Sequence, residues 1–332
     1  ARDIEEQTSL HAVCRYRASL GILSFLLSSW SEATKVKDLY GRTPLHCACQ
    51  YGASLDMVSV LLSSWSDAAK EKDRHRRTPL HSACQHKASL DVVSALLSHS
   101  PDSTKEKDSE GQVPLHYACQ YRASPDIVTT LLKIWPDAAQ QKDNNRRSPL
   151  HYACINGASL DVLSALLNKS SNIAKSKDRY ERTPLHYACL NRASLHMVSL
   201  VLNSWPDAAK ERDRGFKTPL HFACRYKASL NAVLLLLDKW LEATENRNSH
   251  RVKSLSQDSS GDIRNLLSHV SSLFNDEQNN PTHREIMSCF INVNWKNGAL
   301  LVINRYPATA KSLDLHTHVM ADFLSMVVKL QR

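Results

Sequence analysis

The chain has 332 residues, a formal charge of +9 and an apolar fraction of 42%, which predicts a folded protein with one large core or two ordinary ones. Only 8 Gly and 12 Pro are present, too few for the many tight turns of a β-sandwich or for glycine-rich phosphate loops. No apolar run approaches the roughly 20 residues that a membrane span needs, so a soluble protein is expected.

The charge and the cysteines bear on partners and compartment. A basic chain favours acidic partners: phosphorylated or carboxylate-rich protein segments, nucleic acid, or anionic membrane surfaces. Nine cysteines, an odd number without a visible signal sequence, argue for reduced thiols and an intracellular location, in the cytoplasm or nucleus. The chain begins at Ala1 and ends at Arg332, and we expect a fragment from which targeting segments are missing.

A short motif, TPLH or a near variant, recurs along most of the chain at a constant step of 35 residues. The copies begin at Thr8, Thr43, Thr78, Val113, Ser148, Thr183 and Thr218. Self-similarity at a fixed step of this size is the sequence signature of a repeat protein.

The helix-capping residues within one copy predict two short helices. Thr43 is a good N-cap and a proline follows it at the first helical position, so a first helix is expected to run to about Tyr51. Ser54 is expected to cap a second helix, whose apolar stripe begins at Met57 and ends at Leu62. Helices this short are marginal alone and need cover along their apolar faces. Stacked helical hairpins with extended tips, an all-α solenoid, are therefore predicted.

The motif D-x-x-G-x-T-P-L-H-x-A-[AC], followed by V-x-x-L-L, resembles that of ankyrin-repeat proteins. It is seen most clearly as DLYGRTPLHCAC at residues 38–49, and in-phase copies cover about residues 8–252. The step is 35 where the common unit is 33. The tip glycine of the family is kept at Gly41 and Gly111 only, so we expect some other tips to depart from the usual turn.

The last eighty residues fit the repeat poorly. The segment at 304–314 echoes 203–213, but the offset is four residues short of three steps. We expect a repeat array over 1–252 and degenerate helical repeats over 253–332 that act as a cap. In that cap, one helix is expected near Asp262–Phe274, a second unit from Thr282, and a closing helix from Thr317 to Val328.

Each copy places a histidine and a cysteine three residues apart, which suggests a reactive pair or two ligands of a metal site. A catalytic site would not need seven copies of the pair, and a metal site would need further ligands that do not converge on it. Disulfides between stacked copies are excluded because the neighbouring helices lie too far apart. We therefore expect no catalytic residue, no metal site and no cofactor. The resemblance implies that the motif's Thr and His hydrogen-bond across the tip and to the next repeat, and the cysteines fill small core positions. The structural set is Thr43, His46, Thr78, His81, His116, His151, Thr183, His186, Thr218 and His221.

A column of tryptophans follows the second helices, at Trp30, Trp65, Trp135, Trp205 and Trp240. It could stack nucleic-acid bases, but packing between outer helices is the favoured interpretation.

The resemblance assigns partner contacts to the tips and to the two residues after the inner Ala-Cys, facing a concave groove. These positions are rich in Arg and Tyr, which dominate binding energy at interfaces. A merely solvated charged surface is the alternative. The predicted contacts are Tyr40, Arg42, Tyr51, Arg74, His75, Arg77, His86, Tyr121, Asn145, Arg147, Arg179, Tyr180, Arg182, Arg214, Lys217, Arg225 and Tyr226.

The sequence thus predicts a non-catalytic protein-interaction scaffold that binds an acidic protein segment. A nucleic-acid-binding solenoid is the alternative, although no groove-reading motif is present. A His/Cys enzyme or metal site is less favoured.

Overall fold

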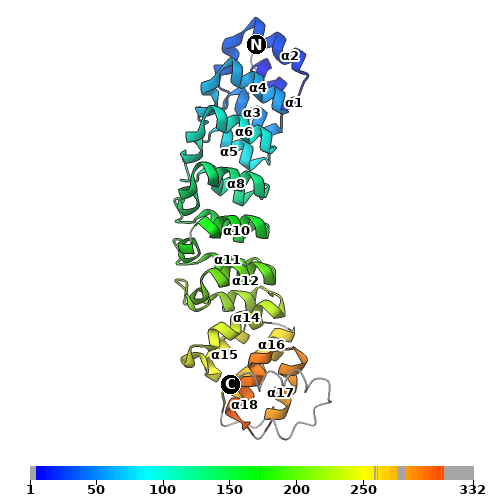
Figure 1. Cartoon of the computed structure of the whole chain (residues 1–332), viewed down its shortest axis with the longest axis vertical. Helices are drawn as coiled ribbons and strands as arrows, with labels where there is room; N and C mark the ends of the chain where they lie inside the picture. The colour runs from blue at the N-terminus through cyan, green and yellow to red at the C-terminus, as the bar shows by residue number, and fades with distance from the viewer. Residues whose placement is uncertain are drawn as a thin grey trace. The chain divides into compact units, whose positions relative to one another are not determined.

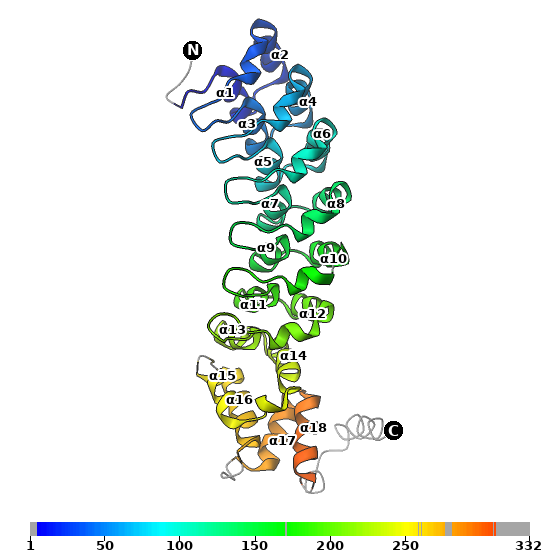
Figure 2. The ribbon, with the colours of Figure 1, turned by 90° about the vertical axis from the view of Figure 1, so that its left-hand side faces the viewer.

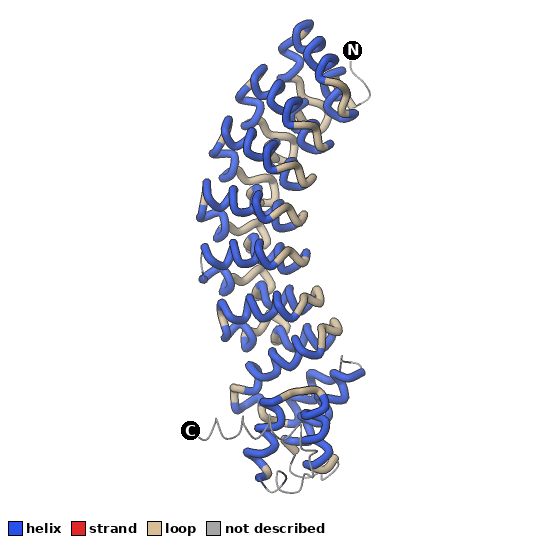
Figure 3. The backbone as a smooth tube through the Cα atoms, turned by 45° about the vertical axis from the view of Figure 1, so that its right-hand side comes forward, coloured by secondary structure: helices blue, strands red, loops and turns tan. Residues whose placement is uncertain are grey.

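A computed structural model describes residues 5–169, 171–257, 259, 261–275, 281–307 and 309. Every regular element in these ranges is a helix (Figures 1 and 3). None of these helices combines the length and the apolar character needed to cross a bilayer. The chain divides into two compact units, residues 1–232 and 233–332, and each is described by itself below. The predicted boundary near residue 252 stays a prediction.

The first unit is a stack of helical hairpins in two layers, one of inner and one of outer helices (Figure 2). The inner helices are α1 (Ser9–Tyr16), α3 (Pro44–Tyr51), α5 (Pro79–Gln85), α7 (Pro114–Gln120), α9 (Pro149–Asn156), α11 (Pro184–Leu190) and α13 (Pro219–Arg225). The outer helices are α2 (Leu20–Ser29), α4 (Leu55–Ser64), α6 (Leu90–His99), α8 (Pro125–Ile134), α10 (Leu160–Lys169), α12 (Leu195–Ser204) and α14 (Leu230–Leu241), and the unit boundary falls within α14. The predicted all-α solenoid is confirmed.

The local signals act as expected. Ser54 caps α4 by accepting a hydrogen bond from the amide of Met57 at 3.4 Å. The stripe of α4, from Met57 to Leu62, is buried at the predicted positions. Burying such side chains contributes about 1.5–3 kcal/mol each, which is how hairpins too short to fold alone are stabilised by their neighbours.

A short 3-10 helix, which the sequence interpretation missed, follows each of the first six outer helices. Five of them bury two small side chains, such as Ala68 and Ala69, and the one at 171–175 buries Ile173 and Ala174. Prolines expected only to end the outer helix begin three of these segments. They are η1 (Ser31–Lys35), η2 (Ser66–Lys70), η3 (Pro101–Lys105), η4 (Pro136–Gln140), η5 (Ser171–Lys175) and η6 (Pro206–Lys210).

The second unit holds η7 (Thr244–Asn246), α15 (Ser249–Ser256), α16 (Gly261–Leu273), α17 (His283–Asn292) and α18 (Lys296–Arg305). The expected helix near Asp262–Phe274 is α16. Thr282, the expected start of the next unit, caps α17: its hydroxyl accepts from the amide of Glu285 at 3.3 Å. The expected closing helix at 317–328 lies outside the described residues.

Candidate interaction surface

Every tip between two repeats of the first unit has the same turn, closed by an aspartate. In the first tip the Oδ1 atom of Asp38 accepts from the amides of Tyr40 (3.0 Å) and Arg42 (2.8 Å). The aspartates at the same position in the other tips repeat this pattern: Asp73, Asp108, Asp143, Asp178 and Asp213.

The expectation that tips without glycine depart from the usual turn is wrong. Gly41 has φ +75°, and Arg76, Arg146, Glu181 and Phe216 adopt left-handed values of 59–62° at the same position. A non-glycine residue costs about 1–2 kcal/mol in this conformation. The two hydrogen bonds to the aspartate, together with the contact to the next tip, hold the turn against that cost.

Neighbouring tips are joined by backbone hydrogen bonds. The amide of Arg74 donates to the carbonyl of Tyr40 at 3.0 Å, and that of Arg214 donates to Tyr180 at 3.0 Å. Equivalent bonds occur between the other tips, so the tips form one continuous, ordered edge of the first unit.

The motif histidines connect each inner helix to the following tip. In the second repeat the amide of Thr43 donates to Nδ1 of His46 at 3.2 Å, and the Thr43 hydroxyl lies 2.9 Å from the same nitrogen. Because Nδ1 accepts from an amide, the ring proton is on Nε2, which donates to the carbonyl of Arg77 at 2.9 Å. Burial lowers the pKa of His46 to about 4.

The same arrangement recurs in the other copies, with Thr78, Thr183 and Thr218 as N-caps of their helices. His81, His116, His151 and His186 reach the carbonyl 31 residues ahead, and burial lowers each of their pKa values to about 4. His221 takes hydrogen bonds from Thr218. His46, His81, His116, His151 and His186 are therefore neutral imidazoles engaged on both nitrogens, which is the geometry of a scaffold.

Four of the predicted contact arginines are paired within the tips. Arg42 is 8% exposed, and its Nη2 atom lies 2.7 Å from Oδ2 of Asp38. Arg77 makes the equivalent 2.7 Å pair with Asp73. Two others reach the next repeat: Arg147 donates to the Tyr187 hydroxyl at 3.0 Å and lies 3.7 Å from Asp178, and Arg182 donates to Asp213 at 3.2 Å. Their charge is largely balanced by buried carboxylates and offers less to a partner than their number suggests.

Other predicted contacts lie on the exposed edge of the tips. Tyr40 and Tyr180 are each 44% exposed, and the guanidinium of Arg42 lies 4.7 Å from the Tyr40 ring centroid. Arg179 donates to the side chain of Asn145 at 2.9 Å, which joins two neighbouring tips. The remaining exposed tip contacts are Arg74, His75, Arg214 and Lys217.

The predicted inner contacts lie where the inner helices end. We define the inner-helix face as the three residues that close each inner helix: 15–17, 50–52, 85–87, 120–122, 155–157, 190–192 and 225–227. Tyr51, Tyr121 and Tyr226 are partly exposed there, and His86 and Arg225 are exposed. The predicted inner contacts, which come from the first two columns of this face, therefore occupy one edge of the inner layer.

The sequence interpretation missed the third column of this face. Five of its seven positions carry a base, Arg17, Lys87, Arg122, Arg192 and Lys227, and all five are exposed. We call them the basic row. The signal was present in the sequence, because a base precedes the recurring Ala-Ser at the 35-residue step in five copies.

The cysteine column faces away from solvent. The seven cysteines beside the motif histidines are buried, and burial raises their pKa, to about 12 at Cys84, Cys154 and Cys224. Thiols that stay protonated at neutral pH are poor nucleophiles and poor metal ligands. No cluster of three or more metal-ligating side chains occurs among the residues that the structure describes.

The tryptophan column is not a preformed ladder. Trp30 is half exposed whereas Trp240 is buried, and no two of these indole rings stack in the described part of the chain.

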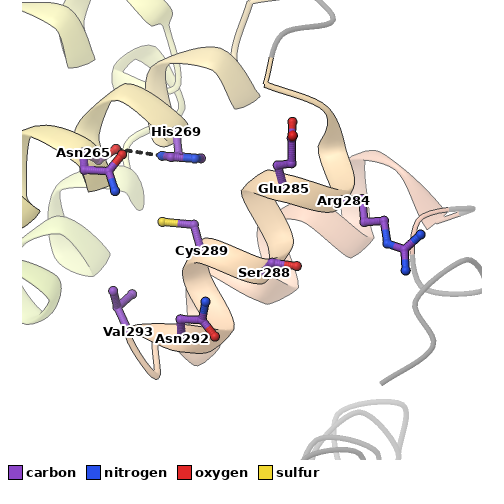
Figure 4. A pocket seen from close by; sticks show the side chains of 8 residues that line it. All are labelled: Asn265, His269, Arg284, Glu285, Ser288, Cys289, Asn292 and Val293. Carbon is purple, nitrogen blue, oxygen red and sulfur yellow. Dashed lines mark hydrogen bonds between the residues drawn. The ribbon is translucent and has the colours of Figure 1, made fainter. Parts of the chain in front are cut away.

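The second unit has a shallow hollow of about 450 Å³ between α16 and α17 (Figure 4). Cys289 points into it near His269, whose Nδ1 donates to the carbonyl of Asn265 at 2.8 Å. Burial raises the pKa of Cys289, so the pair does not present a thiolate at neutral pH.

The fold and this surface define a solenoid repeat protein with an ordered edge of tips and a basic, aromatic inner face. The family model for ankyrin repeats matches residues 1–71, 66–138, 115–210 and 172–249, and the chain belongs to the ankyrin-repeat family. Proteins of this family generally act as protein-interaction scaffolds and are typically not enzymes.

One solved structure with a similar fold is the ankyrin repeat domain of Bcl-3, described as a unique member of the IkappaB protein family. Its TM-score is 0.55 at 24% identity, over 69% of this chain and 98% of that domain, and the likeness concerns the fold alone. No curated protein matches the chain.

Proposed function

We propose that the chain is a non-catalytic scaffold that binds an acidic protein segment along the inner-helix face and the adjoining tips. One observation carries the proposal: the 21 positions of this face include seven bases and not one Asp or Glu. A surface of one charge sign attracts partners of the opposite sign and speeds their encounter.

The tips supply specificity more than charge in this proposal. Tyr40 and Tyr180 offer exposed rings, and Arg74, His75 and Arg214 offer exposed cations, whereas Arg42 is enclosed by its own tip. Exposed Tyr and Arg side chains are the types that contribute most to binding energy at protein interfaces. Reversing Arg77, Arg147 and Arg182 would confound binding with stability, because each arginine faces a buried aspartate.

The sharper test reverses a charge on the inner-helix face. Lys87→Glu removes an exposed cation there, and Lys133→Glu makes the same change on the outer helix α8, where Lys133 is also exposed. The probe is a fluorescent peptide of twelve glutamates, titrated with the full chain. We expect Lys87→Glu to weaken binding by about three- to tenfold, the effect of one exposed ion pair, and Lys133→Glu to change it little. Equal losses in both variants would show that net charge alone attracts the peptide.

Salt dependence separates the protein partner from nucleic acid. Single-stranded DNA tracked through its phosphates should lose affinity steeply, in proportion to the number of phosphates contacted, whereas a protein segment with a few carboxylates should show a shallow slope. Tight, steeply salt-dependent DNA binding without peptide binding would favour the nucleic-acid function instead.

A further inference from the structure

The backbone at the end of each inner helix is left-handed in all seven repeats, a conformation that favours glycine. Glycine occurs there only at Gly52 and Gly157. The other five positions are the basic row, with φ of 53–58°. Each accepts about 1–2 kcal/mol of backbone cost to place a cation where glycine would be unstrained.

A cation at the end of a helix also interacts favourably with the helix dipole, by about 0.3–1 kcal/mol. Arg17 shows this role, because its Nε donates to the carbonyl of Tyr51, the last residue of the next inner helix, at 2.6 Å. Lys87, Arg122, Arg192 and Lys227 differ: their side chains form no hydrogen bond or ion pair with any residue that the structure describes. Their charge is left for a partner.

The row is aligned along the stack. A Cβ atom built on Gly52 would lie 3.0 Å from Nη2 of Arg17, so side chains at this position reach toward the next repeat. Packed helices lie about 8–10 Å apart, and an extended polyproline II chain advances about 3.1 Å per residue and returns every third side chain to the same side. One repeat therefore corresponds to about three residues of a bound segment. Lys87 and Arg122 are one repeat apart, Gly157 leaves a gap, and Arg192 and Lys227 follow.

We infer that the basic row binds an extended acidic protein segment whose carboxylates are spaced three, six and three residues apart. The inference rests on the proposed function and deepens it by naming the charge register of the partner. The pattern is symmetric about Gly157, so it holds for either direction of the bound segment.

The two halves of the pattern are not equivalent. The outer helices beside Lys87 and Arg122 begin with the exposed acids Asp91 and Asp126, whereas His196 and Asn231 stand at the same position beside Arg192 and Lys227. Local repulsion of a carboxylate is therefore weaker in the sixth and seventh repeats. Arg192→Ser should weaken binding more than Arg122→Ser.

The test uses two 13-residue Ser/Thr peptides of equal charge and composition on the full chain, by fluorescence anisotropy in low salt. One carries Glu at positions 1, 4, 10 and 13, the other at 1, 6, 8 and 13, following the polyproline II register of about three residues per repeat. We expect the matched peptide to bind about tenfold more tightly, as one to two well-placed ion pairs would give.

A gain-of-function variant tests the register in a way that a loss of folding cannot imitate. Nothing lies within 4 Å of a Cβ built on Gly157, and five equivalent positions already hold Lys or Arg in the same backbone conformation, so Gly157→Lys should be tolerated. It should strengthen binding of a matched peptide with an added Glu at position 7 by about threefold or more, while the original chain gains less from that glutamate. Gly157→Gln, which fills the same open position in the same backbone conformation without a charge, is the matched control.

The outcomes separate the two proposals. If both 13-residue peptides bind equally and Gly157→Lys shows no preference for the added glutamate, the register is wrong and the acidic-segment function survives. If neither these peptides nor the twelve-glutamate peptide binds, the proposed function itself fails.

Discussion

The tips and the inner-helix face both hold several basic residues, yet the surroundings of the charge differ. In the tips, Arg77 lies 2.7 Å from the buried Asp73, and Arg182 donates to Asp213 of the next tip. On the inner-helix face, Lys87 and Arg122 are exposed without an ion pair to any described residue. The tips therefore use arginine to hold repeats together, and the inner-helix face keeps its charge for recognition. The number of bases in a repeat says little about its binding potential until their partners are known.

The largest expected effect is the loss of stability at low pH, because acid protonates the histidines that connect the inner helices to the tips. Five buried histidines, His46, His81, His116, His151 and His186, have pKa values lowered to about 4. In the unfolded chain they titrate near 6.5, so between pH 6.5 and 4 the unfolded state binds more protons. The free energy of unfolding should be fully present above pH 6.5 and fall below it, by about 1.4 kcal/mol per pH unit for each imidazole.

Urea unfolding followed by circular dichroism at pH 7, 6 and 5 measures this fall. A variant with His116→Gln should show a shallower dependence on pH, because one titrating group is removed. Stability that is constant from pH 7 to pH 5 would contradict the assigned neutral imidazoles.

Reversing a tip arginine should have the next largest effect. Arg77→Glu brings a second carboxylate to Asp73, whose side chain is buried, and leaves that charge without its partner. We expect a loss of about 3 kcal/mol in the free energy of unfolding. Lys87→Glu, with the same charge change on the inner-helix face, should cost no more than about 1 kcal/mol, mainly from the lost interaction with the helix dipole. Similar losses in both variants would show that the two surfaces do not differ as described.

The repeat frame could be predicted from the sequence because every signal for it is local. The caps at Thr43 and Ser54 and the stripe from Met57 to Leu62 lie within one copy, and seven copies in phase fix the helix bounds. The 3-10 segments were missed because a pair of small residues such as Ala68 and Ala69 has no helical period to detect.

The charge balance of the tips could not be predicted in the same way. Arg182 donates a hydrogen bond to Asp213, 31 residues ahead in the next tip, whereas Arg77 pairs with Asp73 of its own tip. The partner of each arginine therefore depends on its side-chain rotamer and not on its position in the repeat. The basic row was visible in the sequence, but only the left-handed backbone at Lys87 and Arg122 shows that these bases are held at a cost.

A smaller effect is expected at the single valine among the helix caps. Val113 supplies the amide to His116 at 3.1 Å but no hydroxyl, whereas the cap hydroxyl lies 2.9 Å from the histidine in the second repeat and its equivalents. Val113→Thr should raise the free energy of unfolding by about 0.5–1.5 kcal/mol through one added hydrogen bond. Thr78→Val is the reverse change and should lower it by a similar amount. Urea denaturation of both variants measures these changes in the free energy of unfolding. A destabilising Val113→Thr would contradict the shared cap geometry.

The smallest effect sharpens the comparison most, because it should separate stability from binding. Lys87 has φ +56°, and Lys87→Gly removes the backbone cost at that position while it deletes a cation of the basic row. The freed left-handed strain, about 1 kcal/mol, is partly offset by the greater flexibility of glycine in the unfolded chain and by the lost interaction of the cation with the helix dipole. The variant should therefore be as stable as the original or more stable, by up to about 0.5 kcal/mol in urea, and should bind the twelve-glutamate peptide more weakly. A residue kept for packing or for capping its helix would show the opposite pairing, with lower stability and unchanged binding.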